Sequence, residues 1–150
     1  MIKILFVCHG NICRSTMAQC VMSDLVKKEG CSEEFYIDSC ATSREEIGNG
    51  IHYGTRHELK KHQIAVLDHR ARQITIEDAK RFDYIIGMDE ANMRNLKRML
   101  PSVYHSKLYK LLSDHDVADP WYTDNFELTF KDVVEGCTNW YRFLRKGEEK

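Results

Sequence analysis

The segment from residue 2 to residue 15, IKILFVCHGNICRS, places an apolar run directly before a short polar loop. The run Ile2–Val7 is interrupted only by Lys3, a pattern that is typical of a strand buried on both faces of a parallel sheet. After the loop, apolar residues recur at helical spacing from Thr16 to Glu29. The segment therefore predicts a strand, a loop over residues 8–15 and a helix.

The loop has the composition of an anion-binding site. Between a strand end and a helix start, successive backbone N–H groups lack intrahelical partners and converge on an anion in front of them. Gly10 permits a tight turn, and Asn11 belongs to the few non-glycine residues that tolerate a left-handed conformation. Arg14 offers a planar fork of donors for two phosphate oxygens. We therefore predict that phosphate is bound by His9, Gly10, Asn11, Ile12, Cys13, Arg14 and Ser15.

Cys8 opens this loop, where hydrogen-bond donors and positive charge favour the thiolate form of its side chain. A thiolate is a nucleophile, and Ser15 can donate its hydroxyl to the sulfur, also when the thiolate has to leave. The alternative is a buried structural cysteine, because cysteine is among the most buried residue types. The preceding strand, the following helix and the glycine and asparagine between them together favour the nucleophile.

Strands and helices alternate along the rest of the chain, which predicts an α/β fold with a four-stranded parallel sheet, helices on both faces and the phosphate-binding loop after the first strand. In such sheets ligands bind outside the carboxyl ends of the strands, where the strand order reverses. We expect one domain over residues 1–150, and a solvated tail over Arg145–Lys150. The expected strands are Ile2–Val7, Phe35–Ala41, Phe82–Met88 and Val103–Leu108, and the expected helices are Thr16–Glu29, Gly54–His62, Thr75–Arg81, Asp89–Met99 and Asn125–Leu144.

A second candidate segment, Val117–Tyr122, reads VADPWY. When a thiolate attacks phosphorus, the leaving oxygen needs a proton, so an acid must lie near the loop. Pro120 disfavours helix just before it and stiffens a loop that could hold Asp119 over the cradle. An Asp-Pro pair taken alone predicts only a turn, and Asp114 and Asp116 are further candidates for the acid.

The Cys-x5-Arg-Ser loop resembles the signature of the low molecular weight protein tyrosine phosphatases, and the resemblance extends over essentially the whole chain. It implies hydrolysis of phosphotyrosine phosphomonoesters in proteins, and of small aryl phosphates, through a phosphocysteine intermediate. The family's acid lies in a matching Asp-Pro-aromatic-aromatic segment, which assigns that role to Asp119. The implied catalytic residues are thus Cys8, Arg14 and Asp119, with Asn11, Ser39 and His69 as a supporting network.

The resemblance also assigns a substrate pocket. It makes Ile12, Trp121 and Tyr122 walls for a phosphotyrosine ring, and Ile12 favours phosphotyrosine because relatives that prefer phosphoarginine tend to carry threonine there. Glu45, with Glu46 beside it, stands where relatives often place an aromatic residue on the rim, so this pair should repel acidic phosphopeptides and favour basic ones. The usual proline and glutamate after the loop are replaced by Thr16 and Gln19. The segment Met88–Asn92 also matches a segment of the family, but Asp89 is equally well explained as a helix N-cap.

Composition excludes several classes of function. The net charge of −1 gives no basic field for nucleic acid, and no apolar run approaches the ~20 residues of a membrane span. No secretion signal opens the chain, so we expect a cytoplasmic protein, acting as a monomer on phosphotyrosine-containing proteins or peptides. We expect neither metal nor cofactor, because the cysteines lack metal-type spacing and are taken as free thiols: Cys8, Cys13, Cys20, Cys31, Cys40 and Cys137.

Three alternatives stay open at this point. An arsenate reductase or a phosphoarginine phosphatase could use the same scaffold, but related reductases carry a cysteine pair near Tyr84–Glu90, where this chain has none. A phosphate carrier would accept the phosphoryl group on Cys8, and water would not hydrolyse the phosphocysteine. Cys13 is either a small buried filler or a partner that captures oxidised Cys8 in a reversible regulatory disulfide.

Overall fold

The computed structural model describes residues 1–147 and contains a four-stranded sheet. Its strands are β1 (Ile2–Cys8), β2 (Phe35–Ala41), β3 (Tyr84–Gly87) and β4 (Leu108–Lys110). They lie in the order β2-β1-β3-β4, and all neighbouring strands are parallel. The chain first adds β2 on one side of β1 and later β3 on the other, so the strand order reverses at β1. The carboxyl end of β1 is therefore the place where a ligand site is expected.

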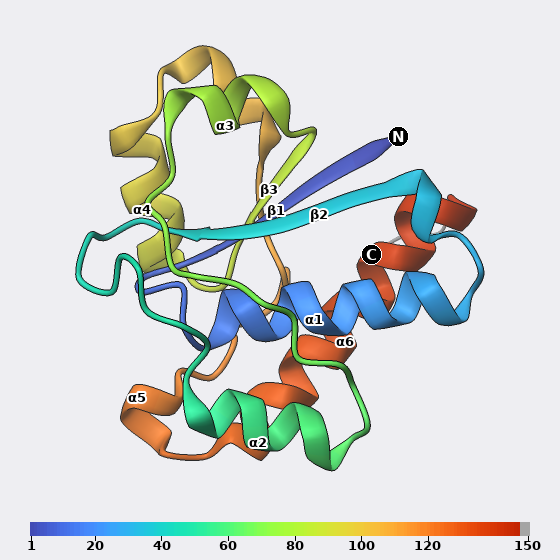
Figure 1. Cartoon of the computed structure of the whole chain (residues 1–150). Coiled ribbons are helices and arrows are strands. Elements are labelled where there is room, and N and C mark those ends of the chain that lie inside the picture. The colour runs from blue at the N-terminus through green and yellow to red at the C-terminus, as the bar shows by residue number, and fades with distance from the viewer. Residues whose placement is uncertain (148–150) are drawn as a thin grey trace.

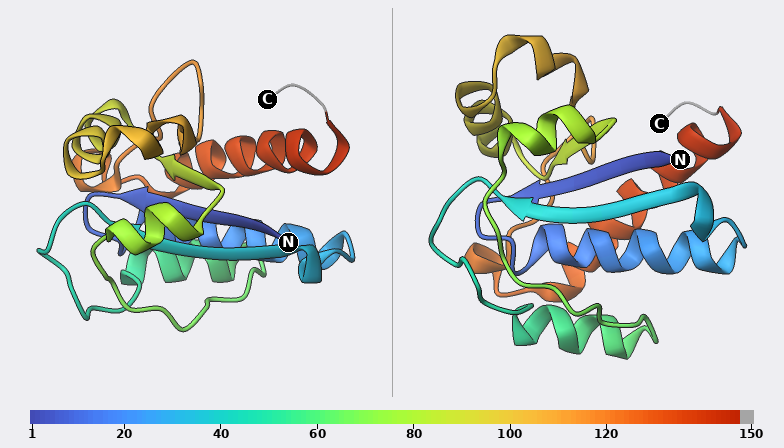
Figure 2. Two further views of the ribbon diagram at one scale, coloured as in Figure 1. Left: turned by 90° about the horizontal axis from the view of Figure 1, so that it is seen from above. Right: turned by 45° about the horizontal axis from the view of Figure 1, so that its top comes forward.

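Helices cover both faces of this sheet, as Figure 1 and Figure 2 show. This arrangement confirms the predicted α/β fold with a four-stranded parallel sheet. Helices α1 (Arg14–Lys28), α2 (Tyr53–Lys61) and α6 (Phe126–Lys146) lie on one side, α3 (Ile76–Arg81) and α4 (Glu90–Met99) lie on the other, and the short helix α5 (Pro120–Thr123) precedes α6.

The alternation of side chains along β1 explains its unbroken apolar run. Ile4 and Phe6 pack into one apolar cluster with residues of α1 and α6, whereas Leu5 and Val7 pack into a second cluster with residues of α3 and α4. All four side chains are 0% exposed. Because both faces of the strand are covered over residues 4–7, each of these positions needs an apolar side chain, whereas Lys3 lies at the less buried start of the strand.

Eight of the nine expected elements have both ends within two residues of their predicted bounds, but the expected strand Val103–Leu108 is wrong. Residues Ser102–Lys107 form a 3-10 helix, and strand β4 starts only at Leu108. Pro101 begins this turn with a φ of −56°, and the N–H of Tyr104 donates to its carbonyl at 3.0 Å. Val103 is 74% exposed, so its β-branched side chain has no sheet face to pack on.

Helix α6 runs further than predicted. Asn125 caps its start by accepting from the N–H of Leu128 at 3.0 Å, and Gly147 ends it with a left-handed φ of 74°. The expected tail therefore begins too early at Arg145, whose guanidinium lies 3.2 Å from Glu34 Oε2, while residues 148–150 lie outside the described part of the chain. Within residues 1–147, no helix combines the length and the apolar character needed to cross a membrane.

Candidate active site

The loop of residues 8–15 lies at the carboxyl end of β1, directly before α1. Asn11 has a φ of 59°, the left-handed conformation expected for it. The N–H groups of Thr42 and Ser43 donate to the carbonyls of Cys8 and His9 at 3.0 and 3.1 Å. These backbone bonds tie the loop to the segment that follows β2, which leaves the inner N–H groups of the loop available for a ligand.

The thiol of Cys8 is 3% exposed and has two hydrogen-bond partners in the loop. Its Sγ lies 3.0 Å from Ser15 Oγ and accepts from the N–H of Asn11 at 3.2 Å. Helix α1 starts at Arg14, so the positive end of the helix dipole also lies beside the sulfur. Donors and a helix N-terminus stabilise a thiolate at this position.

Cys13, in the same loop, has surroundings that favour the neutral thiol. Its burial, followed by the charge of Cys8, raises the pKa of the Cys13 thiol to about 12, although Thr55 and Arg14 oppose this shift. Cys13 is therefore a neutral thiol at physiological pH. The two cysteines of one loop thus have different chemistry.

Arg14 is 3% exposed, and two carboxylates hold its guanidinium. Its Nη1 lies 2.7 Å from Asp89 Oδ2, and its Nη2 lies 3.3 Å from Asp119 Oδ2. Burial lowers the pKa of Arg14, but Cys8 and the two carboxylates outweigh this effect and raise it. Asp89 also caps helix α4 by accepting from the N–H of Asn92 at 2.7 Å. It therefore combines the cap that its sequence predicts with a contact to Arg14 that the sequence did not reveal.

Of the three candidate acids, Asp119 is the one that contacts Arg14. Its Oδ1 accepts from the N–H of Trp121 at 3.1 Å, so Asp119 caps the short helix α5, which the sequence did not predict. Pro120 is the first residue of this helix, where a missing N–H costs nothing. Asp116 instead pairs with Lys110 at 2.8 Å, and Asp114 hydrogen-bonds His115 at 2.8 Å.

The three predicted supporting residues meet behind the loop. The amide nitrogen of Asn11 donates to Ser15 Oγ at 2.8 Å and to Ser39 Oγ at 3.0 Å. Its Oδ1 accepts from the backbone N–H of Arg72 at 3.3 Å and contacts His69 Nε2 at 2.8 Å. Because the backbone N–H of Arg72 can only donate, it fixes which end of the amide is oxygen, and the proton shared with His69 then sits on Nε2. The amide of Asn11 is thereby fully hydrogen-bonded.

Two further residues extend this network. The hydroxyl of Ser39 donates to Gln19 Oε1 on α1, and His69 Nδ1 lies 3.7 Å from Asp38 Oδ1. Burial lowers the pKa of His69, and the carboxylate of Asp38 does not offset that shift, so His69 is neutral at pH 7. The sequence offered one signal for Gln19, its departure from the glutamate of the resembling family.

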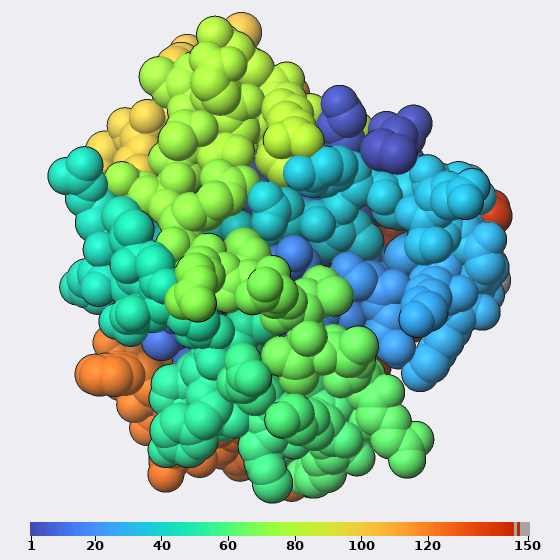
Figure 3. Space-filling model, in the orientation of Figure 1, coloured from blue at the N-terminus to red at the C-terminus, as the bar shows by residue number. Residues whose placement is uncertain are grey.

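The structure places the predicted pocket residues in different settings. Trp121 and Tyr122 are 86% and 84% exposed, so they are surface aromatics rather than core residues. Glu45 Oε2 lies 2.7 Å from His9 Nε2, and a Cβ added at Gly10 would approach Glu46 Cγ to 3.3 Å. Ile12 is half-buried in the loop. In Figure 3, a small area of blue from the start of the chain is visible between the teal segment that follows β2 and the orange segment around α5.

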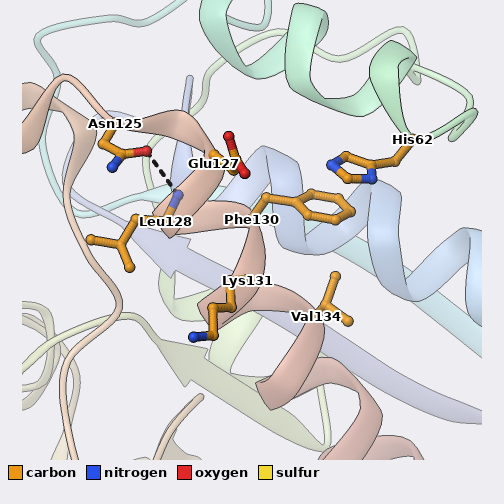
Figure 4. A pocket seen from close by; sticks show the side chains of 7 residues that line it. All are labelled: His62, Asn125, Glu127, Leu128, Phe130, Lys131 and Val134. Atoms are coloured by element: carbon orange, nitrogen blue, oxygen red, sulfur yellow. Dashed lines mark hydrogen bonds between the residues drawn. The ribbon is translucent and has the colours of Figure 1, made fainter.

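A groove lies elsewhere, between the end of α2 and the start of α6 (Figure 4). It has a volume of about 650 Å³ and is lined by Phe130, Lys131, Leu128 and other residues of this region. The ring of His62 stacks on Phe130 at a centroid distance of 3.9 Å. No residue of the loop 8–15 lines this groove, so its size alone does not make it the reactive site.

Comparison with known proteins agrees with the geometry of the loop. Residues 3–150 match the family described as "Low molecular weight phosphotyrosine protein phosphatase". The protein of that name from Rattus norvegicus is 42% identical over 144 residues, which cover 90% of each chain. A solved low molecular weight protein tyrosine phosphatase from Streptococcus pyogenes is 47% identical with a TM-score of 0.88, covering 96% of this chain and 93% of that one.

The same fold also occurs in a solved structure described as a drosophila arginine phosphatase. It is 29% identical to this chain, has a TM-score of 0.86 and covers 99% of both chains. The same fold therefore serves more than one phosphorylated side chain, so the preference between them depends on the residues around the loop.

Proposed function

Because this chain belongs to the low molecular weight phosphotyrosine protein phosphatase family and acts as a protein tyrosine phosphatase, we propose that Cys8, Arg14 and Asp119 carry out its chemistry. In this proposal Cys8 is the nucleophile, Arg14 binds the phosphate oxygens, and Asp119 is first acid and then base. The N–H groups of residues 9–15 complete the phosphate cradle.

The reaction has two displacements. In the first, the sulfur of Cys8 attacks phosphorus, the S–P bond forms, the bond between phosphorus and the tyrosine oxygen breaks, and Asp119 gives that oxygen a proton. In the second, Asp119 takes a proton from water, the water oxygen attacks phosphorus, and the S–P bond breaks to release inorganic phosphate. The hydroxyl of Ser15 stabilises the departing thiolate, from which it lies 3.0 Å away.

The contact that carries this proposal is the one between Arg14 Nη2 and Asp119 Oδ2, at 3.3 Å. It brings a carboxyl group from the start of α5 to the cation of a loop more than a hundred residues away in sequence. A phosphate held by Arg14 would therefore lie between the sulfur of Cys8 and an acid. Geometry of this kind turns a bimolecular reaction into an effectively unimolecular one.

The decisive test compares two variants. Cys8→Ser should abolish turnover of 4-nitrophenyl phosphate while still binding inorganic phosphate in calorimetry. Asp119→Ala should lower kcat/KM for a phosphotyrosine peptide by roughly 10²-fold or more, because it removes the proton donor. Asp124→Asn, a change in an exposed carboxylate five residues away, is the matched control and should keep full activity. If the wild type instead releases one equivalent of 4-nitrophenol per protein molecule and then stops, it is a phosphate carrier.

We propose phosphotyrosine rather than phosphoarginine as the preferred group. Ile12 supports this preference, because its apolar side chain at the loop suits an aromatic ring better than a guanidinium. A comparison of kcat/KM on peptides that differ only in phosphotyrosine, phosphoarginine or phosphoserine tests it directly, and a preference for phosphoarginine would contradict it.

The remaining proposals concern the whole protein. We propose one domain over residues 1–150, which the family match over residues 3–150 supports, and a monomer that works in the cytoplasm without a metal. Light scattering at the concentration of the assay tests the monomer, and unchanged activity in excess EDTA tests the absence of a metal requirement.

A further inference from the structure

Ala118, the residue directly before the proposed acid Asp119, is bonded to helix α6 through both its N–H and its carbonyl. The backbone N–H of Ala118 donates to Asp132 Oδ2 at 2.9 Å, and its carbonyl accepts from Thr129 Oγ1 at 2.8 Å. Asp132 and Thr129 lie three residues apart and therefore on the same side of the helix. Both polar groups of the Ala118 backbone are thus bonded to side chains rather than to other backbone groups.

Asp132 is a buried carboxylate, which makes its partners informative. The residue is 8% exposed, and Thr129 is 0% exposed. Burying an ionised group is costly unless hydrogen bonds compensate for the lost water. Within residues 1–147, no Lys or Arg forms an ion pair with Asp132, and the imidazole of His115 lies 3.5 Å from its other oxygen. The Ala118 N–H therefore compensates for part of the cost of burying this carboxylate, alongside His115, and a hydrogen bond to a charged group is stronger than one between neutral groups.

Neighbouring contacts fix the other end of the same segment. The N–H of Val117 donates to the carbonyl of Met88 at 2.9 Å, and the carbonyl of Val117 lies 3.4 Å from Arg14 Nη1. Val117 is thus hydrogen-bonded to the residue that follows β3, and Ala118 is hydrogen-bonded to α6. Two consecutive residues with four bonded backbone groups leave the chain little freedom where Asp119 begins, and catalytic geometry is sensitive to displacements of about 1 Å.

We propose that Asp132 and Thr129 are positioning residues that place the carboxyl group of Asp119 for proton transfer, an inference that rests on the proposed role of Asp119 as general acid. Neither residue touches the substrate. They act through Ala118, and their contribution should appear only in the step that needs the proton of Asp119.

The dependence of the rate on the leaving group separates positioning from mere folding. The phenol of tyrosine, with a pKa of about 10, is a poor leaving group that needs the acid, whereas 4-nitrophenol leaves readily without it. Asp132→Ala and Thr129→Val should each lower kcat/KM for a phosphotyrosine peptide about tenfold, and for 4-nitrophenyl phosphate about twofold or less. Glu127→Gln, which removes an exposed carboxylate from the same helix, is the control and should change neither value.

A double-mutant cycle makes the test sharper. In an Asp119→Ala background, Asp132→Ala should cause no further loss of kcat/KM, because the group that it positions is gone. An equal loss in both backgrounds, or an equal loss on both substrates, would overturn the inference. Should Asp132→Ala fail to fold in circular dichroism, the isosteric Thr129→Val variant decides the same question.

The experiment also separates this inference from the function on which it rests. If Asp119→Ala itself affects both substrates equally, the proposed general acid is wrong. If Asp119→Ala shows the steep dependence on the leaving group and the Asp132 and Thr129 variants do not, only the positioning role is wrong.

Discussion

Asp89 contacts Arg14 with one carboxylate oxygen and caps helix α4 with the other. Its Oδ2 lies 2.7 Å from Arg14 Nη1, and its Oδ1 accepts from the N–H of Asn92 at 2.7 Å. A helix start from one side of the sheet therefore sets the orientation of a cation that belongs to the loop after β1.

These two roles can be separated by substitution. Asn is as good an N-cap as Asp but carries no charge, so Asp89→Asn should keep its stability and lower kcat/KM roughly tenfold, or about 1.4 kcal/mol. Asp89→Ala should lose in addition about 1 kcal/mol of the free energy of unfolding. Urea unfolding and steady-state kinetics measure the two effects. Full activity of Asp89→Asn would show that the charge of Asp89 contributes nothing to catalysis.

Asn11 combines a left-handed backbone with a fully bonded amide, and two variants distinguish these features. Asn11→Gly keeps the backbone conformation, with its φ of 59°, and loses the side-chain network, whereas Asn11→Ala loses both. A left-handed alanine costs roughly 1–2 kcal/mol, so we expect the alanine variant to unfold at lower urea than the glycine variant. Both should lose kcat/KM, because Ser15 and His69 lose their partner. An active glycine variant would argue that only the backbone matters.

Asp78 links stability to pH. Burial alone would raise the pKa of its carboxyl, but a two-pronged contact with Arg72, at 2.9 and 3.1 Å, and the N–H of Thr75 outweigh burial and lower it. A lowered pKa in the folded state means that Asp78 stabilises the fold above the pKa of the unfolded chain, about 3.9, and that this contribution is lost as pH falls.

Asp78→Asn should therefore lower the free energy of unfolding by about 2 kcal/mol at pH 7, and the difference from wild type should shrink below about pH 4. Glu77→Gln changes an exposed neighbour and serves as the control. Urea unfolding at pH 3.5, 5 and 7 measures the trend. A difference that stays constant with pH would mean that the carboxylate charge contributes nothing.

Gly136 marks a close contact between α6 and the segment after β4. A Cβ at this position would lie 2.4 Å from Leu111 Cγ, which is too close for either group to stay in place. Alanine favours a helix over glycine by about 1 kcal/mol, but overpacking costs about 1–3 kcal/mol, so Gly136→Ala should destabilise the protein. Gly50→Ala, where a Cβ meets open space, should not. Thermal unfolding of both variants checks this, and a stabilised Gly136→Ala would show that the interface yields easily.

Local patterns in the sequence predicted what local physics decides. The run Ile2–Val7 is apolar at each core position because the strand is covered twice, and the glycine and asparagine after it have few alternatives in a tight loop. Val103 and Tyr104 also have strand-forming side chains, yet the turn that begins at Pro101 decides their conformation. A propensity of single residues is weaker than a fixed φ and a closed hydrogen bond.

Two of the contacts that the sequence did not reveal are non-local. Asp89 reaches Arg14 across 75 residues, and Asp132 reaches Ala118 across 14. Asp89 as a helix cap and Asp132 as a carboxylate on a helix each have an ordinary local explanation. The residues next to them in the sequence do not indicate that either has a second, distant partner. Only packing of α4 and α6 around the loop gives them that partner. The resemblance to a family directed attention to Asp119, which the Asp-Pro pair alone did not.

The two loop cysteines should differ in their reactivity. With its pKa raised to about 12 by burial and by the charge of Cys8, Cys13 is protonated at pH 7–9, whereas the donors around Cys8 favour its thiolate. Iodoacetamide at pH 7 should therefore modify Cys8 well before Cys13, as peptide mass spectrometry can follow. Inorganic phosphate should slow this modification. Faster labelling of Cys13 would contradict the proposed nucleophile.

Oxidation should change this relation. Peroxide converts a thiolate to a neutral sulfenic acid, which removes the Cys8 charge that helps to raise the pKa of Cys13. Cys13 then becomes easier to deprotonate next to an electrophilic sulfur, so mild peroxide should yield a Cys8–Cys13 disulfide that dithiothreitol reverses. The Cys13→Ser variant should lose activity irreversibly under the same treatment, because nothing intercepts the sulfenic acid before further oxidation. Equal recovery of the variant and the wild type would leave Cys13 as a buried filler of the loop.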